Sequence, residues 1–467
     1  MLDRAACFHL LQSRHHLRFR VLGRLIVLPL SFVQIVFQFG RIQGFRSIVA
    51  CPVFCAGESI GNSDGRLRRS LVRYWSFTFG KVALYNEILI LSGEGVDMHG
   101  FTATYQIQAS SLEDAKNWAA SVAREETIEC IDEGVPHAFI LDEVLGKVVT
   151  VSERGPSGYN AVIFYNREIT GNELPQLLNI LYGNSSMHVG VKLVDISIPE
   201  DTLKAFPGPR YGAKGVREKT KRQTGPLLCT VLKPVGLTPK ELAELAYQCV
   251  LGGVDIIKDD HSFGMQKWAP FEKRVETIAA AVAKGNAETG NSTLYAPSMN
   301  CSLDKFEEHA RFAVQAGAGA YLVMPGLTGW DSIRFLASSK ELSLPIMAHP
   351  SGMGSIPNAG TNGLSHSMLY AIYPRLVGAD VSIYPSFGGR YGFSKELCVQ
   401  VANDCRNPNG LFQPILPAPG GGMTIELAKL LREMYGDDAV FLFGGGAMRY
   451  KDRIASGVKE LRAALSL

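Results

Sequence analysis

The chain contains 467 residues, which is enough for about two or three domains of roughly 150 residues each. Hydrophobic residues make up 46% of it and charged residues 19%, and this composition excludes a wholly disordered chain. The formal net charge of +3 excludes a strongly basic surface, so we expect no nucleic-acid partner. The nine cysteines form no CxxC pair, which indicates reduced thiols and a cytoplasmic protein.

Residues 1–97 differ from the rest of the chain. They are rich in arginine and contain a single lysine, Lys81. Their apolar run, residues 25–39, is shorter than the ~20 residues that a membrane-spanning helix needs. We therefore expect no membrane span and no export signal. We interpret residues 1–97 as an atypical extension from a start codon placed too early, and we expect Met98 to be the working start.

Residues 98–224 carry the pattern of a small α+β domain. Alternating apolar residues predict strands, and apolar residues three and four apart predict helices. The expected elements are a strand at 101–109, a helix at 111–124, strands at 146–153 and 160–166, and a helix at 173–181. We expect this domain to end in the polar stretch 212–224.

Residues 225–467 repeat a short apolar strand followed by a segment of helical length. Thr238-Pro239-Lys240-Glu241, for example, is a capping box with proline at the first helical position. Eight such units predict a (β/α)₈ barrel, in which chemistry sits at the carboxyl ends of the strands. The expected strands are 227–234, 253–260, 293–300, 320–326, 344–350, 379–385, 415–421 and 440–446.

The second predicted barrel strand ends in a cluster of polar side chains. Because side chains alternate along a strand, Lys258 and Asp260 share one face, and His261 follows where the chain turns away. A carboxylate and an imidazole suit a divalent ion, but a lysine ammonium would repel it. Carbamylation of Lys258 by CO₂ would turn that side chain into an anionic oxygen ligand and complete a metal site.

Other strand ends supply groups for a phosphorylated substrate. Glycine triplets end the seventh and eighth strands, and their backbone N–H groups predict a phosphate site; the residues are Gly420, Gly421, Gly422, Gly444 and Gly445. Lys233, at the end of strand one, is a candidate for moving protons or stabilising an enolate. Arg390 is a candidate anion clamp after strand six. His349 is either a catalytic group or a hydrogen-bonded wall residue.

The stretches 232–237 and 252–261 resemble the RuBisCO large-chain superfamily, and the resemblance runs in motif order from about residue 101 to the C-terminus. It implies a smaller N-terminal domain of ferredoxin-like type before the barrel. It also implies that Lys258 is carbamylated and binds one Mg²⁺ with Asp260 and His261. Asn184 matches a substrate-contacting asparagine. Glu125 matches a glutamate contributed to a neighbouring subunit's site, which implies at least a homodimer.

The chain also departs from the carboxylating members of that family. Histidine stands at 261 in place of glutamate, and Val235 in place of a second lysine. Pro350 replaces an arginine, Gly420 replaces a serine, and the loop after strand six offers Arg390 and no clear lysine. Without those groups CO₂ fixation is excluded, and the sequence resembles the RuBisCO-like proteins known as form IV.

Two activities of RuBisCO-like proteins with a Lys-Asp-Asp-His motif remain open. One is decarboxylation of 3-oxo-isoapionate 4-phosphate in carbohydrate breakdown, for which Arg390 offers a carboxylate site, and we favour it. The other is isomerisation of 5-methylthioribulose 1-phosphate in methionine salvage, for which Met324 or Trp330 would line an apolar pocket. A non-catalytic regulatory RuBisCO-like protein is the third reading, and the retained lysines and aspartate argue against it.

Overall fold

The structure is a computed structural model that describes residues 99–155, 158–408, 410–444 and 453–466, together with five short strands nearer the N-terminus. The chain divides into two compact units, residues 1–95 and residues 96–467. In the first unit, β1, β2 and β3 form an antiparallel sheet and β4 pairs with β5. These strands are β1 (Leu11–Ser13), β2 (His16–Val21), β3 (Arg24–Pro29), β4 (Phe39–Gly40) and β5 (Val49–Ala50).

The expected start at Met98 lies outside the described residues. Strand β3 takes up the beginning of the apolar run 25–39, and residues 30–38 also lie outside the description. Among the described residues, no helix combines the length and the apolar character needed to cross a bilayer.

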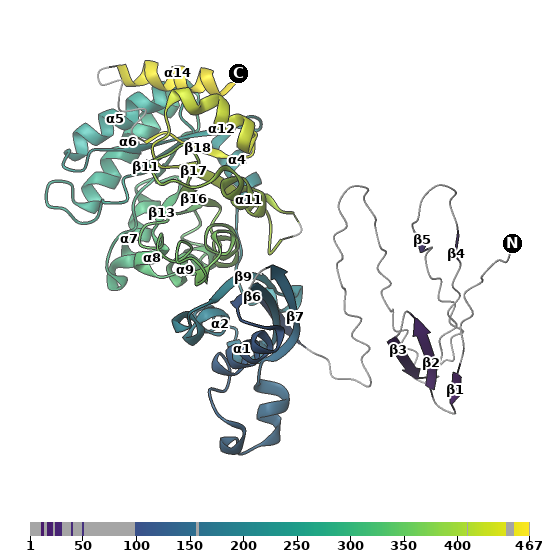
Figure 1. The fold of residues 1–467 in the computed structure, drawn as a ribbon. Coiled ribbons are helices and arrows are strands. Elements are labelled where there is room, and N and C mark those ends of the chain that lie inside the picture. The colour runs from purple at the N-terminus through teal and green to yellow at the C-terminus, as the bar shows by residue number, and fades with distance from the viewer. Residues whose placement is uncertain are drawn as a thin grey trace, which may run out of the picture. The chain divides into compact units, whose positions relative to one another are not determined.

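The smaller domain of the second unit has the β-α-β-β-α-β order of a ferredoxin-like fold. Its antiparallel sheet has the strand order β9-β6-β8-β7, and α1 packs against β6, β7 and β8 (Figure 1). The elements are β6 (Gly100–Gln108), α1 (Leu112–Glu125), β7 (Lys147–Gly155), β8 (Gly158–Asn166), α2 (Leu174–Tyr182) and β9 (Val191–Ser197). Every second residue of β6 from Phe101 to Ile107 is buried, as the sequence pattern predicts.

The larger part is a parallel barrel whose eight strands match the eight predicted ones. One arc of four strands has the order β12-β11-β10-β18, and the other has the order β13-β14-β16-β17. A bridge between Ser298 and Leu322 joins the arcs on one side, and β17 lies against β18 on the other. The strands are β10 (Leu227–Leu232), β11 (Ile256–Asp259), β12 (Leu294–Ala296), β13 (Tyr321–Val323), β14 (Ile346–Ala348), β16 (Val381–Pro385), β17 (Leu416–Gly420) and β18 (Val440–Leu442).

Helices follow the strands and surround them in Figure 1. Helix α5 begins with the predicted capping box: Thr238 accepts from the Glu241 N–H, and the Glu241 side chain accepts from the Thr238 N–H. The helices are α5 (Pro239–Leu251), α6 (Phe271–Thr289), α7 (Leu303–Gln315), α8 (Pro325–Thr328), α9 (Asp331–Ser338), α10 (Tyr373–Val377), α11 (Lys395–Arg406), α12 (Ala428–Tyr435) and α14 (Ile454–Ser466). The predicted fold class, a barrel with a smaller α+β domain, is confirmed.

The polar stretch 212–224, which the sequence pattern predicts as the end of the smaller domain, contains a helix that packs on the barrel. Helix α4 (Gly212–Thr220) packs Val216 into the barrel interior, beside Leu227 and Val440. The N–H groups of Tyr211 and Gly212 both donate to Asp380, which is fully buried. Helix α4 therefore packs against the strand ends opposite those that carry the predicted site. The predicted boundary at residue 224 stays a prediction.

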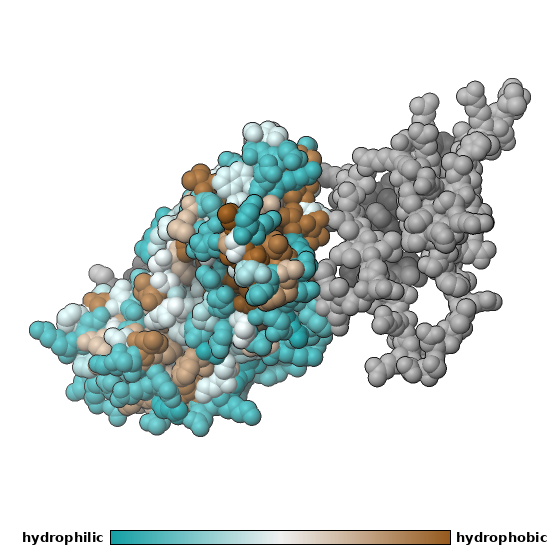
Figure 2. Space-filling model, turned by 90° about the horizontal axis from the view of Figure 1, so that it is seen from below, coloured by the Kyte–Doolittle hydropathy of each residue, from teal (hydrophilic) through white to brown (hydrophobic). Residues whose placement is uncertain are grey.

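The two parts of the second unit are joined through a short strand, β15 (Gly363–Leu364), which extends the small sheet beside β9. Lys192 in β9 donates to the backbone oxygens of Pro357 and Gly360. The face of the molecule in Figure 2 is mostly hydrophilic, with hydrophobic residues scattered between.

Candidate active site

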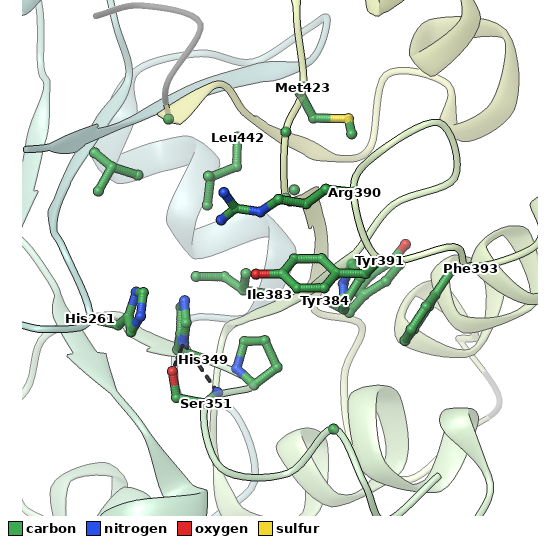
Figure 3. Close-up of a pocket in the computed structure, with 18 of the residues that line it drawn as sticks. His261, His349, Ser351, Ile383, Tyr384, Arg390, Tyr391, Phe393, Met423 and Leu442 are labelled. Atoms are coloured by element: carbon green, nitrogen blue, oxygen red, sulfur yellow. Dashed lines mark hydrogen bonds between the residues drawn. The ribbon is translucent and has the colours of Figure 1, made fainter. Parts of the chain in front are cut away.

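A cavity of about 470 Å³ opens at the carboxyl ends of the barrel strands (Figure 3). It brings together residues that are far apart in the sequence and that were predicted at or just after six different strand ends. The predicted residues that line it are Lys233, Lys258, Asp260, His261, His349, Arg390, Gly420, Gly421, Gly422 and Gly444. Gly445 lies outside the described residues.

Strand β11 positions the first group of side chains. Lys258 and Asp260 both line the cavity, as the alternation along the strand predicts, and Asp259 between them points the other way. Lys258 is only 2% exposed, and its ammonium donates to the backbone oxygen of Asp259 over 3.0 Å. Lys258 is therefore a buried side chain in the wall of the cavity.

Asp259 anchors the end of β11 on the side of the strand that faces away from the cavity. Its carboxylate accepts from Arg274 Nε of α6 at 3.1 Å, from the Tyr295 hydroxyl at 2.9 Å and from the Ser298 N–H at 3.1 Å. The side chains of Asp259 and Arg274 are both fully buried. Because a buried carboxylate is stable only when paired and hydrogen-bonded, this arrangement fixes the backbone that carries Lys258 and Asp260.

The cavity floor is rich in positively charged and imidazole groups around one carboxylate. Asp260 lies 3.4 Å from Lys233 Nζ and 3.3 Å from His261 Nδ1. Burial alone would raise the pKa of Asp260, but the Ser262 N–H and the neighbouring His261 and lysines lower it below its usual value. Burial also lowers the pKa of Lys258 to about 8, against the pull of Asp260.

Two histidines stack beside this cluster. The rings of His261 and His349 lie 5.0 Å apart and nearly parallel. Burial lowers the pKa of His349 well below its usual value, and the charge of Lys258 lowers it further. Burial likewise lowers the pKa of His261, although Asp260 opposes the shift. Both rings are therefore neutral near pH 7, the form in which imidazole binds metals.

The glycine segment after β17 and the loop after β16 form the opposite side. Gly420 and Gly421 accept through their carbonyl oxygens from the N–H groups of Ser386 and Arg390. The Arg390 guanidinium lies over the Tyr391 ring and points into the cavity (Figure 3). Within the described residues no carboxylate pairs with Arg390, so its charge is directed at the cavity.

Two predicted binding residues lie elsewhere in the described chain. Glu125, at the end of α1, accepts a hydrogen bond from the Asn184 amide over 3.1 Å. Neither residue lines the cavity. The structure therefore brings Glu125 and Asn184 together but does not place them with the barrel residues of the same chain.

The suggestion that Met324 or Trp330 lines an apolar pocket is wrong. Met324 follows the three-residue strand β13 and is buried inside the barrel with Val216 and other interior side chains. Trp330 packs edge-to-face on Tyr373, outside the cavity. Ala320, Leu322 and Met324 all belong to the interior cluster, so the alternation along this strand turns Met324 into the barrel interior.

The apolar wall comes instead from residues that sequence reasoning missed. They lie on β16, on the loop that follows it and after β17: Ile383, Tyr384, Tyr391, Phe393 and Met423. Ser351 was also missed, although it lines the cavity and contacts His349. The only sequence signal for these residues is that they lie at or just after the ends of predicted strands.

Comparisons with known proteins place the chain in a family. The model of the ribulose bisphosphate carboxylase large chain, catalytic domain, matches residues 212–390. A 5-methylthioribulose-1-phosphate isomerase from Rhodospirillum rubrum is 34% identical over 366 residues, which cover 78% of this chain and 96% of that protein. The chain belongs to the RuBisCO large-chain superfamily, within its RuBisCO-like proteins.

Two further relatives narrow the class. A 2,3-diketo-5-methylthiopentyl-1-phosphate enolase from Bacillus velezensis is 32% identical over 328 residues, covering 68% of this chain and 80% of that protein. The crystal structure of a Rubisco-like protein from Rhodopseudomonas palustris matches with a TM-score of 0.70 at 33% identity, covering 79% of this chain and 97% of that one. The chain is thus a RuBisCO-like enzyme of the non-carboxylating kind.

Proposed function

We propose that this enzyme isomerises a phosphorylated ketose through an enediolate, with 5-methylthioribulose 1-phosphate as its substrate. The observation that carries the proposal is the cavity itself, in which Lys233, Lys258 and Asp260 face an apolar wall. The similar isomerase and enolase named above support this choice, since both of their names describe methylthio sugar phosphates. The decarboxylase favoured by the sequence stays a second candidate.

The donor set fits Mg²⁺ once Lys258 carries CO₂. In the described residues no group of three or more His, Cys, Asp or Glu side chains is arranged to hold a metal, so Asp260 and His261 need a third ligand. A carbamate on Lys258 would supply anionic oxygen beside Asp260, which is the ligand type that Mg²⁺ prefers. The ion, when bound, would stabilise negative charge on the substrate's ketone and hydroxyl oxygens.

Lys233 is the residue that we assign to proton transfer. Its Nζ lies 3.4 Å from Asp260 and it lines the cavity. A substrate bound at the proposed metal ligands would therefore have its carbons close to this amine. In its neutral form the Lys233 amine would take a proton from the carbon beside the ketone and return a proton to the former carbonyl carbon, while the hydroxyl proton on the first carbon passes to the former carbonyl oxygen. The carbonyl group moves along the chain by this exchange, and no atom is gained or lost.

The phosphate would lie at the glycine segments. Gly420 lies in the β17 ladder with β16, so the N–H groups of Gly421, Gly422 and Gly444 are the backbone donors on this side. Arg390 adds a positive charge at the same side. One phosphate, and no second one, is expected to be held there.

The apolar wall is the specific reason to prefer the methylthio substrate. A methylthio group is apolar and polarisable, and it gains from contact with aromatic rings and methionine sulfur. Tyr384 and Phe393 offer such an aromatic surface in the same cavity. We propose that this surface takes the sulfur end of the substrate.

Arg390 is the specific reason to keep the decarboxylase as a second candidate. Its guanidinium has no carboxylate partner in the described chain, and it would hold the carboxylate of 3-oxo-isoapionate 4-phosphate bidentately. Loss of CO₂ would then generate the enediolate directly, and Lys233 would reprotonate it.

Purified enzyme with Mg²⁺ and bicarbonate is given each substrate separately, and isomer formation and CO₂ release are both followed. We expect a new ketose phosphate from 5-methylthioribulose 1-phosphate and no CO₂ from the 3-oxo acid. CO₂ release alone would replace the isomerase by the decarboxylase. Lys233→Ala serves as the control, because it should lose turnover and keep metal binding.

A further inference from the structure

Ser351 makes two contacts with the same ring nitrogen of His349, Nδ1. Its backbone N–H lies 3.3 Å from His349 Nδ1, and its hydroxyl oxygen lies 3.0 Å from the same atom. Figure 3 draws both contacts as dashed lines, with the opposite edge of the ring turned into the cavity.

The backbone contact decides which nitrogen carries the hydrogen. An N–H group only donates, so Nδ1 must offer a lone pair to the Ser351 N–H. A hydrogen on Nδ1 would point at the Ser351 N–H, and two donors cannot form a hydrogen bond with each other. In neutral imidazole the remaining hydrogen then sits on Nε2, at the edge that faces the cavity.

The ring has little freedom to choose another orientation. His349 is anchored through its own N–H, which donates to the Val323 oxygen over 2.8 Å at the end of β14. One ring face stacks on His261, with the ring centroids 5.0 Å apart and an angle of 15° between the ring planes. A flip that exchanged the ring edges would break both contacts with Ser351.

We propose that Ser351 is a positioning residue that fixes His349 as the Nε2–H tautomer, so that His349 donates a hydrogen bond to the substrate oxygen that becomes negative in the enediolate. His349 is then an electrostatic stabiliser and takes no proton from carbon. The catalytic part rests on the proposed function, whereas the tautomer follows from the contacts of Ser351 alone. Preformed donors of this kind act where charge develops in the reaction.

The tautomer is read directly by two-dimensional ¹H–¹⁵N NMR of the full chain labelled with ¹⁵N-histidine. His349→Gln identifies the signals by their loss. We expect Nδ1 of His349 to show the ¹⁵N chemical shift of an unprotonated ring nitrogen and Nε2 that of a protonated one. The reverse pattern, or protons on both nitrogens, would overturn the assignment of Ser351.

A matched pair of variants tests the catalytic part. In Ser351→Asp the new carboxylate is charged and outweighs the weak 3.3 Å contact of the backbone N–H, so it accepts from Nδ1–H and reverses the tautomer. The kcat should then fall on the order of 100-fold with KM within about threefold. Ser351→Asn has the same shape and keeps a side-chain donor, so its kcat should exceed that of the aspartate variant by about tenfold or more.

Three outcomes are informative. Equal kcat in the aspartate and asparagine variants, with the tautomer reversed only in the first, would refute the donor role of His349. A reversed tautomer that tracks the loss of kcat supports it. If the wild type shows the expected tautomer but isomerises no ketose phosphate, the proposed function fails and the positioning role of Ser351 stands.

Discussion

Lys258 is enclosed by the barrel, and its burial has a direct chemical consequence. A lysine of ordinary pKa is neutral in roughly one molecule in a thousand at pH 7.5, whereas one with a pKa of about 8 is neutral in roughly one in four. CO₂ adds only to the neutral amine. The burial that disfavours the ammonium therefore prepares this residue for carbamylation.

From this shift we expect activation by bicarbonate and Mg²⁺ to rise between pH 7 and pH 9, because the neutral fraction of Lys258 grows through its pKa of about 8. The enzyme is preincubated at each pH and assayed at a single pH, so that only activation varies. Lys258→Arg, which stays charged, should show no activation at any pH. Activation that falls with rising pH would contradict a carbamate at Lys258.

His349 gives a second prediction at this scale. If it donates through Nε2, a glutamine amide at 349 replaces the donor and an alanine does not. We expect kcat of His349→Gln to exceed that of His349→Ala by about tenfold. The ratio comes from steady-state kinetics of the two variants. Equal, complete loss in both would indicate that His349 moves a proton itself.

The sequence predicts the residues of the proposed metal site but not all of their neighbours. Lys258, Asp260 and His261 are readable because a strand alternates its side chains and the cluster ends the strand. The role of Ser351 cannot be predicted from the sequence, since it depends on the orientation of the His349 ring. Met324 could have been placed by the same rule, since Ala320, Leu322 and Met324 alternate along the strand and all face the barrel interior.

At the scale of elements, strand β11 is fixed by helix α6 through the buried pair of Asp259 and Arg274. Arg274→Met leaves the Asp259 carboxylate buried with one partner fewer, so the free energy of unfolding should fall by about 3–5 kcal/mol. Chemical denaturation measures it. Lys273→Met, next along the same helix but in an exposed pair with Glu276, should leave stability unchanged. Similar losses in both variants would refute the role of the buried pair.

The glycine segment after β17 is packed against the loop that carries Arg390. A methyl group on Gly421 would lie 2.9 Å from the Tyr391 ring, so Gly421→Ala should displace Tyr391 and raise KM for the phosphorylated substrate about tenfold. Gly392→Ala is the matched control, because it has a similar positive φ with open space around it. A KM that rises equally in both variants would trace the effect to backbone strain.

The regular elements follow from sequence wherever their periodicity is clean. All eight barrel strands are predicted, and the structure shortens several of them. Strand β9 is missed because a bulge interrupts it: Leu193 and Ile196 are buried, three positions apart, so the alternation breaks. Helix α4 is predicted as part of a polar tail because only Val216 reveals its packing on the barrel.

For the molecule as a whole, the cavity holds the barrel residues but neither Glu125 nor Asn184. We expect these two residues to complete the cavity of a second copy in a homodimer. Lys258→Ala and Asn184→Ala subunits, co-expressed with different tags, form hybrids in which one site is intact. Isolated hybrids should regain about half of the wild-type activity. Hybrids as inactive as their parents would contradict a shared site.

The central claim is that the enzyme forms an enediolate on a phosphorylated ketose at the Lys258 cluster. Its most direct test is ¹H NMR of 5-methylthioribulose 1-phosphate in D₂O with enzyme, Mg²⁺ and bicarbonate. We predict that deuterium replaces the hydrogen on the carbon beside the ketone, that this exchange needs both additives, and that it vanishes in Lys258→Ala. Isomer formation or exchange that persists in Lys258→Ala, or no exchange in the activated wild type, would contradict the claim.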